Sequence, residues 1–250
     1  EIDALREEVI RIHADNWRLL SAAAATYQQV QHGGFLIAGQ FERGGHRGGG
    51  RVMNSARRDR VRALQLMEQA RATLPADLAG ADRAQFYLDF ADQLLGGEGA
   101  AGAWRLQALT DLSQLPDYEE GWGRGFEQPG APVDEQGNPI FYSASRIWDE
   151  AQSDGQRWRW ALVQAAEASA ERQPEVQLRL ADFLRGQFGV ETLASFRWLR
   201  GGALEGASDE TGVFALHTLG EDETIARLAT GVKRFKLPDE FNYLKLYQQV

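Results

Sequence analysis

The chain has 250 residues, no cysteine and a formal net charge of −9 at pH 7. The lack of cysteine excludes disulfides, thiolate metal sites and cysteine nucleophiles within this sequence, and the acidic balance argues against general nucleic-acid binding. The sequence also contains no apolar run long enough to span a bilayer.

The first elements in chain order are two amphipathic helices. Residues 1–12 place Ile2, Leu5, Val9 and Ile12 at spacings of three and four, which predicts a helix with one apolar face. Asp15 or Asn16 is suited to cap a second helix, whose stripe contains Trp17, Leu20, Ala24 and Tyr27. Gly33-Gly34 breaks the chain, and we expect a short helix from Phe35 that ends at Arg43.

A glycine-rich loop follows, and then three predicted helices. We expect a helix from Asn54 or Ser55 to about Leu74, and Pro75 to end it. Apolar residues at helical spacing predict two more helices, over about 80–96 and 101–114, joined by a glycine turn.

Residues 116–144 change character, because they contain four of the seven prolines and no helical period. Gln136-Gly137-Asn138-Pro139 favours a turn between Val133 and the apolar run 140–142, so a small hairpin is expected there. The aromatic residues of this segment indicate an ordered surface insertion.

The last third of the chain again favours helices. We expect them at about 145–152, 154–170, from Pro174 to Gly189, at 190–199 and at 221–229, with a final helix from Pro238. Residues 201–212 read as an acidic loop, and 214–219 as a short strand or a turn.

Short helix pairs separated by tight turns predict an all-α fold. We expect a tetratricopeptide-like α-solenoid of stacked antiparallel helix pairs, interrupted by the insertion at 116–144. The prediction is one domain over 1–250, with helical pairs in 1–115 and 145–250. Both ends fall inside helical patterns, which indicates a piece of a longer protein.

The chemical exception in this acidic sequence is the basic region 43–58. Its loop holds five glycines between residues 44 and 50, and glycine turns before a helix N-terminus form anion sites. Three interpretations are open: salt bridges within the chain, a surface for a protein partner, or a phosphate or nucleotide site. The candidate contact residues are Arg43, His46, Arg47, Arg51, Arg57 and Arg58.

No motif predicts catalysis, a metal or a cofactor. The four histidines, at positions 13, 32, 46 and 217, lack the spacing of a metal site. The serines have no nucleophile context. One alternative remains, a carbohydrate-active enzyme with an aromatic and acidic cleft near 117–126, where Asp117, Glu119 and Glu120 lie beside Trp122.

Several phrases carry a family resemblance across nearly the whole chain. Among them are DNWRLL at 15–20, GQFERGGHRGGGRVMN at 39–54, AWRLQALTDLSQLPDYEEG at 103–121, APVDEQGNPIFY at 131–142 and ALHTLGEDETIARLATGVKRFKLPDEFNYLKLYQQ at 215–249. The chain resembles the helical N-terminal region of very large bacterial alpha-2-macroglobulin-family proteins of the planctomycete type.

This resemblance implies a periplasmic or extracellular multidomain protein related to protease inhibitors. Family members trap proteases with a bait region and, in many, a Cys-Gln thioester; this sequence has no cysteine and therefore holds no thioester. What is expected of this segment is a non-catalytic scaffold. Its partners would be proteins, either downstream domains of the same chain or other envelope proteins.

Overall fold

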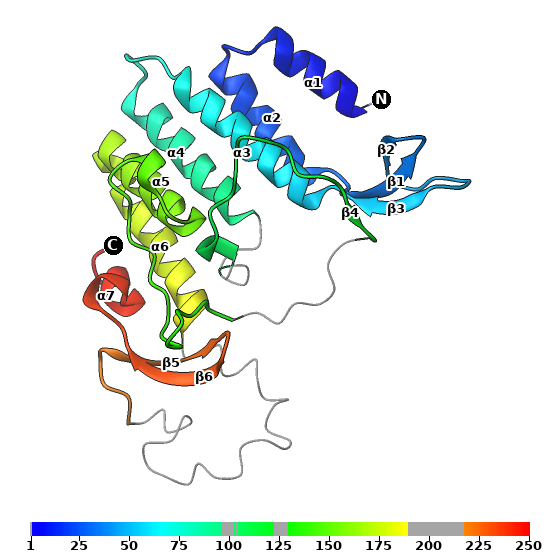
Figure 1. Ribbon diagram of the computed structural model, residues 1–250. Helices are drawn as coiled ribbons and strands as arrows, with labels where there is room; N and C mark the ends of the chain where they lie inside the picture. Colours follow the sequence, from blue (N-terminus) through cyan, green and yellow to red (C-terminus); the bar gives the residue numbers. More distant parts are fainter. Residues whose placement is uncertain (1, 97–102, 104, 123–129, 190–217) are drawn as a thin grey trace. The chain divides into compact units, whose positions relative to one another are not determined.

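A computed structural model describes residues 2–96, 103, 105–122, 130–189 and 218–250. The chain forms two compact units (Figure 1). Unit 1 is Glu1–Gly97 with Thr110–Glu127, and unit 2 is Glu98–Leu109 with Gln128–Val250.

Unit 1 combines four helices with a small sheet. The helices are α1 (Ile2–Ile12), α2 (Trp17–Gln29), α3 (Ala56–Ala72) and α4 (Gly80–Leu95), and the strands are β1 (Gly33–Ile37), β2 (Gln40–Arg43), β3 (Arg51–Asn54) and β4 (Glu119–Glu120). Helices α2, α3 and α4 lie side by side, with the sheet at one end of α2 and α3 (Figure 1). Their apolar faces meet in a core that includes Leu20, Ala24, Leu64, Met67, Phe86 and Phe90.

The sheet overturns the predicted all-α fold. Its strand order is β2-β1-β3-β4, with antiparallel neighbours throughout. The helix expected over 35–43 is the β1–β2 hairpin, whose turn residues Ala38 and Gly39 have φ values of 49° and 82°, as in a two-residue turn that suits strand twist. At Gly34 a Cβ would lie 2.2 Å from the carbonyl oxygen of Glu42, so β1 and β2 pair this closely only with glycine there.

Unit 2 contains two long helices and a hairpin. Helices α5 (Asp154–Ala168) and α6 (Gln173–Phe188) pack against each other, and β5 (Glu223–Leu228) pairs with β6 (Gly231–Lys236). Its described part also contains the short 3-10 turns η2 (Trp148–Glu150), η3 (Ala170–Arg172) and η6 (Asp239–Phe241) and the short helix α7 (Tyr243–Tyr247). Tyr142 holds the segment before α5 in place, because its hydroxyl donates to the Ala103 carbonyl over 2.5 Å.

Four further helix predictions in the described residues are wrong or too long. Within the helix predicted over 221–229, residues 223–228 form strand β5, in which Glu223 pairs with Arg234 across the hairpin and Ile225 is buried. Residues 145–152 form only the turn η2, and the described part of 101–114 has a short 3-10 stretch followed by chain without regular secondary structure. The chain from Pro238 onward is η6 followed by α7.

The turn expected near 136–139 is present. Val133 and Pro139 form an antiparallel bridge, and the Asp134 carboxylate accepts from the backbone N–H groups of Gln136 and Asn138. The predictions for 190–199 and 201–212, and most of that for 214–219, lie outside the described residues.

Candidate interaction site

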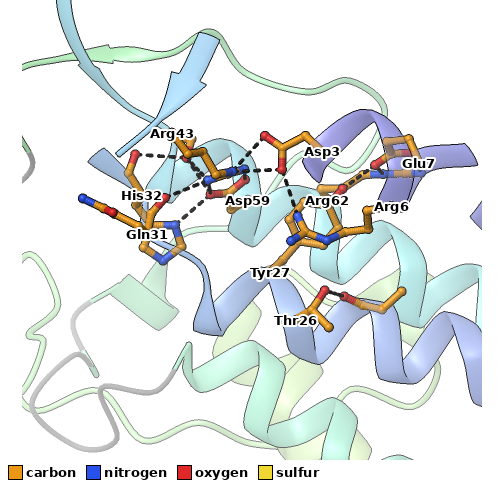
Figure 2. A network of polar contacts seen from close by, with 12 residues as sticks. Asp3, Arg6, Glu7, Thr26, Tyr27, Gln31, His32, Arg43, Asp59 and Arg62 are labelled. Atoms are coloured by element: carbon orange, nitrogen blue, oxygen red, sulfur yellow. Dashed lines mark hydrogen bonds and ion pairs between the residues drawn. The ribbon is translucent and has the colours of Figure 1, made fainter. Parts of the chain in front are cut away.

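A polar network ties α1 to the rest of unit 1. Figure 2 shows Asp3, Arg6 and Glu7 on one side of α1, turned toward β2, α2 and α3. Asp3 bonds to Arg6 over 3.1 Å and to the Arg43 Nε over 2.8 Å. Positions three and four residues apart share a face of a helix, so this side of α1 is its polar side.

Arg43 and Asp59 form the centre of this network. The Arg43 guanidinium donates to both carboxylate oxygens of Asp59 over 2.7 Å, and Ser55 donates to the same carboxylate over 2.6 Å. His32 Nδ1 lies 2.7 Å from Asp59 Oδ2. The side chains of Asp59 and Arg43 are only 3% and 13% exposed, so the hairpin strand β2 is fixed to α3 by a buried, two-point ion pair.

A second centre lies one turn further along α1. Glu7 accepts from Arg62 Nε over 2.9 Å and Nη2 over 2.6 Å, and the Tyr27 hydroxyl donates to the same carboxylate. Burial, followed by this contact with Glu7, raises the pKa of Tyr27 to about 12. Arg6 lies over the Tyr27 ring at 4.4 Å, so α1 is held on α2 and α3 mainly through charged groups.

The same contacts set a testable dependence on pH. Burial by itself raises the pKa of Asp59, but the hydrogen bonds with His32, Arg43 and Ser55 lower it below the ordinary value of 3.8. A carboxylate whose pKa is lower in the folded state than in the unfolded chain stabilises the folded protein. This stabilisation is complete above the pKa of the unfolded chain and is lost as the pH falls through the pKa of the folded state. In urea unfolding, we therefore expect the stability difference between wild type and Asp59→Asn to be full at neutral pH and to shrink below 3.8. A difference that stays constant in acid would contradict the assigned ionisation.

The six predicted contact residues do not gather at one point, because three of them bind partners in different parts of unit 1. Arg43 is in the buried network, whereas Arg51 pairs with Glu120 over 3.2 Å. Arg58 donates to the Pro116 carbonyl over 2.8 Å and lies 5.0 Å from the Tyr118 ring centre. These contacts are the ion pairs and hydrogen bonds that the first interpretation of this region expects.

Of the other three candidates, His46 and Arg47 lie on the glycine-rich loop and Arg57 lies in the first turn of α3. His46 Nδ1 is 3.6 Å from a Glu42 carboxylate oxygen, and Arg47 and Arg57 are exposed. The loop carries the chain from β2 past β1 to β3. Gly44, with φ of 87°, and Gly48, with φ of 144°, adopt backbone conformations that favour glycine. The path of this loop across the sheet therefore explains why glycine occupies these positions.

The acidic residues near 117–126 are placed as follows in the described part. Glu119 and Glu120 are consecutive residues of β4, so their side chains point to opposite faces of the sheet. Glu120 pairs with Arg51, and Tyr118 stacks on Phe41 with ring centres 4.4 Å apart. This arrangement binds β4 to β3 and provides no facing carboxylate pair from these two residues.

The apolar stripe of α1 has an unexpected orientation. Ile2, Leu5, Val9 and Ile12 are 66%, 65%, 38% and 60% exposed, while Ile10 is buried. Helix α1 lies at the outer edge of unit 1, beside α2 (Figure 1). It uses its polar face to bind the body of the unit and presents its apolar face to the surroundings.

A groove of about 570 Å³ runs between α2 and α4. One wall is formed by small residues of α2, including Ala22 and Ala25, and Trp17 meets Phe86 edge to face with ring centres 6.0 Å apart. The other wall carries the polar side chains of α4, namely Asp82, Gln85, Asp89, Asp92 and Gln93. These polar residues recur at helical spacing, so they could have been predicted from the sequence to share one face of α4.

Among the described residues, none of the helices has the length and apolar character needed to cross a membrane. Comparisons of the chain with known protein families, with curated proteins and with solved structures gave no match.

Proposed function

We propose that this chain is a non-catalytic module that makes protein–protein or interdomain contacts through the exposed face of α1. The observation that carries the proposal is the inverted packing of that helix. Three charged residues of α1 face the body of unit 1, and four large aliphatic residues face outward. Contiguous exposed apolar side chains are characteristic of interaction surfaces.

The geometry of the stripe favours a helical partner surface. Ile2, Leu5, Val9 and Ile12 follow the three-four spacing with which one helix packs against another. The partly buried ion pairs on the opposite side hold α1 in place before binding, which reduces the entropy lost on association. The stripe is therefore a preformed surface on a fixed helix.

The resemblance to alpha-2-macroglobulin-family proteins adds a context to this proposal. In that context the module belongs to an exported, periplasmic or extracellular protein related to protease inhibitors. The partner is then a downstream domain of the same chain or another envelope protein.

Site-specific photo-crosslinking tests the proposal. With a photoreactive amino acid at Leu5, we expect a cross-link to one defined protein or to another segment of the parent chain, identified by mass spectrometry. The matched control is Arg11, which is exposed on the flank of the same helix. Equal cross-linking from the two positions would refute a specific surface.

The partner found in this way permits a quantitative prediction. The double substitution Leu5→Glu with Ile12→Glu is expected to weaken its binding by at least about tenfold, because charged groups replace two apolar contacts at the interface. Arg11→Glu should change the affinity by less than about twofold, as rim charges do in salt. Both variants should unfold in urea like the wild type, since none of these side chains is buried. An unchanged affinity of the double variant would contradict the assignment.

A further inference from the structure

We infer that one face of the sheet in unit 1 binds a neutral carbohydrate, which stacks on Trp122. This Trp122 surface consists of Trp122, Phe35, His46 and Glu42. The inference goes beyond the proposed function, because the ligand is a sugar rather than a protein and the surface uses no residue of α1. The two can therefore be tested separately.

The register of the strands brings these side chains to the same face. Phe35 of β1 and Glu42 of β2 lie directly opposite each other, so their side chains share one face of the sheet. Gly33 is two residues before Phe35 in β1 and belongs to that face as well. The Trp122 ring lies over Gly33, where a Cβ would come within 2.9 Å of Cε3 of the ring. Glycine at position 33 therefore makes room for the tryptophan.

The aromatic rings of this surface hold one another in place. Phe35 meets Trp122 with ring centres 5.4 Å apart and an interplanar angle of 86°, and it meets His46 at 5.9 Å and 52°. Edge-to-face contacts of this kind are favourable. Among the described residues, Trp122 is nevertheless the one aromatic side chain that is mostly exposed, at 60%. A large ring is thus fixed on the sheet while most of it faces solvent, as stacking of a ligand requires.

Two polar side chains beside the rings have unused hydrogen-bonding capacity. His46 Nδ1 is 3.6 Å from the Glu42 carboxylate, which is too long for a hydrogen bond. Neither side chain has another hydrogen-bond partner within the described part of the chain. The Glu42 side chain is 56% exposed and that of His46 is 31% exposed. A ligand can therefore reach both groups from solvent.

The charges of this region favour a neutral ligand that carries hydroxyl groups. A carboxylate only accepts hydrogen bonds, so Glu42 binds hydroxyl groups and repels phosphates and other carboxylates. Arg47 follows His46 in the chain and is exposed, and its charge disfavours a cationic ligand. A sugar carries no charge, offers hydroxyl donors to Glu42, and can donate to His46 or accept from it.

The geometry of the rings favours a flat ligand. Aromatic residues that bind a cation place their ring faces toward it, but in the Phe35–Trp122 pair the edge of one ring meets the face of the other. The exposed part of Trp122 is therefore one flat surface rather than a cage. A pyranose ring with equatorial hydroxyl groups, as in β-linked glucose, has C–H groups on its faces and hydroxyl groups around its rim. Stacked on Trp122, such a ring directs its rim hydroxyls toward Glu42 and His46.

Isothermal titration calorimetry with the full 250-residue chain tests this inference. The probe is cellohexaose, a neutral oligomer of β-linked glucose. We expect a dissociation constant of about 1 mM or below, which corresponds to about 4 kcal/mol and suits one stacked ring with a few hydrogen bonds. No binding of cellohexaose at concentrations up to about 10 mM would overturn the inference.

Three substitutions locate the binding. Trp122→Ala should weaken cellohexaose binding by at least about tenfold, whereas Trp122→Phe, which keeps a ring, should weaken it by less than about threefold. Glu42→Gln keeps the shape of the side chain and removes the charged acceptor, so it should weaken binding by several fold. If Trp122→Ala binds cellohexaose like the wild type, the sugar binds elsewhere and the assignment fails.

The control is the double variant Leu5→Glu with Ile12→Glu on α1, which should bind cellohexaose like the wild type. Trp122 and Glu42 are mostly exposed, so their variants should also unfold in urea like the wild type. Loss of sugar binding in the α1 variant would place the sugar on α1 and overturn the assignment.

Tetramethylammonium chloride separates a sugar site from a site for organic cations. This cation binds to aromatic faces, but we expect it to leave cellohexaose bound when the two are present at equal concentration. Displacement of the sugar at that concentration would show a cation site and would overturn the carbohydrate assignment. Failure of these assays leaves the α1 cross-linking result untouched, so the two proposals are distinguishable.

Discussion

Asp59→Asn is expected to cost about 3–5 kcal/mol of the free energy of unfolding, the range for breaking a buried ion pair. The substitution leaves the Arg43 guanidinium 13% exposed and without its main counterion. It also replaces one of the two carboxylate oxygens with an NH2 group, whereas Ser55 and His32 both contact Oδ2 and Arg43 contacts both oxygens. Because α1, β2 and α3 meet at this pair, the loss affects the packing of three elements at once.

Chemical denaturation measures this cost, with the surface substitution Glu8→Gln as control. Glu8 pairs with Arg11 where the two side chains are 52% and 71% exposed, and a pair of that kind contributes at most about 1 kcal/mol. A loss below about 1 kcal/mol for Asp59→Asn would mean that the Arg43 network does not stabilise unit 1.

Gly155→Ala is expected to destabilise unit 2 by about 1–3 kcal/mol, the usual cost of overpacking a core. Helix propensity alone predicts the opposite sign, since alanine is better than glycine inside a helix by about 0.5–1 kcal/mol. A Cβ at this position in the first turn of α5 would lie 2.1 Å from Cδ1 and 2.4 Å from Cε1 of Tyr142. The Tyr142 ring is buried, and its hydroxyl is bonded to Ala103, so it has little freedom to move.

A double-mutant cycle with Tyr142→Ala checks the cause. Without the ring the clash disappears, so Gly155→Ala should become neutral or stabilising in that background, with a coupling energy of about 1–3 kcal/mol. Additive effects of the two substitutions would show that the ring contact is not the reason.

The sequence by itself determined the long helices and their buried faces. The helices predicted from Trp17, over 80–96, over 154–170 and from Pro174 correspond to α2, α4, α5 and α6, and their apolar residues are buried in the structure, such as Leu20, Phe90, Trp158 and Leu180. Asn16 also caps α2, accepting from the Leu19 N–H over 3.2 Å. These features are readable because a helical period repeated over 13 to 16 residues is a local signal that tertiary contacts reinforce.

The strands could not be predicted from the sequence in the same way. β1 and β2 have five and four residues, and β5 has six, too few to separate an alternating pattern from part of a helix. Their conformation depends on partners elsewhere in the chain. For β5 the acids that resembled a helix N-terminus belong to cross-strand pairs, of Glu223 with Arg234 and of Asp222 with Lys236.

The candidate surfaces show the same division. The sequence identified the apolar stripe of α1, and it marked Arg43 as one of several unusual cations. Only the tertiary structure decided that Arg43 pairs with Asp59 and that α1 turns its charged face inward. The physical reason is that ion pairing and burial depend on which distant residues meet. On α1, Asp3 and Glu7 meet Arg43 and Arg62 only in the folded unit, so the sequence alone does not show which side of this helix faces inward.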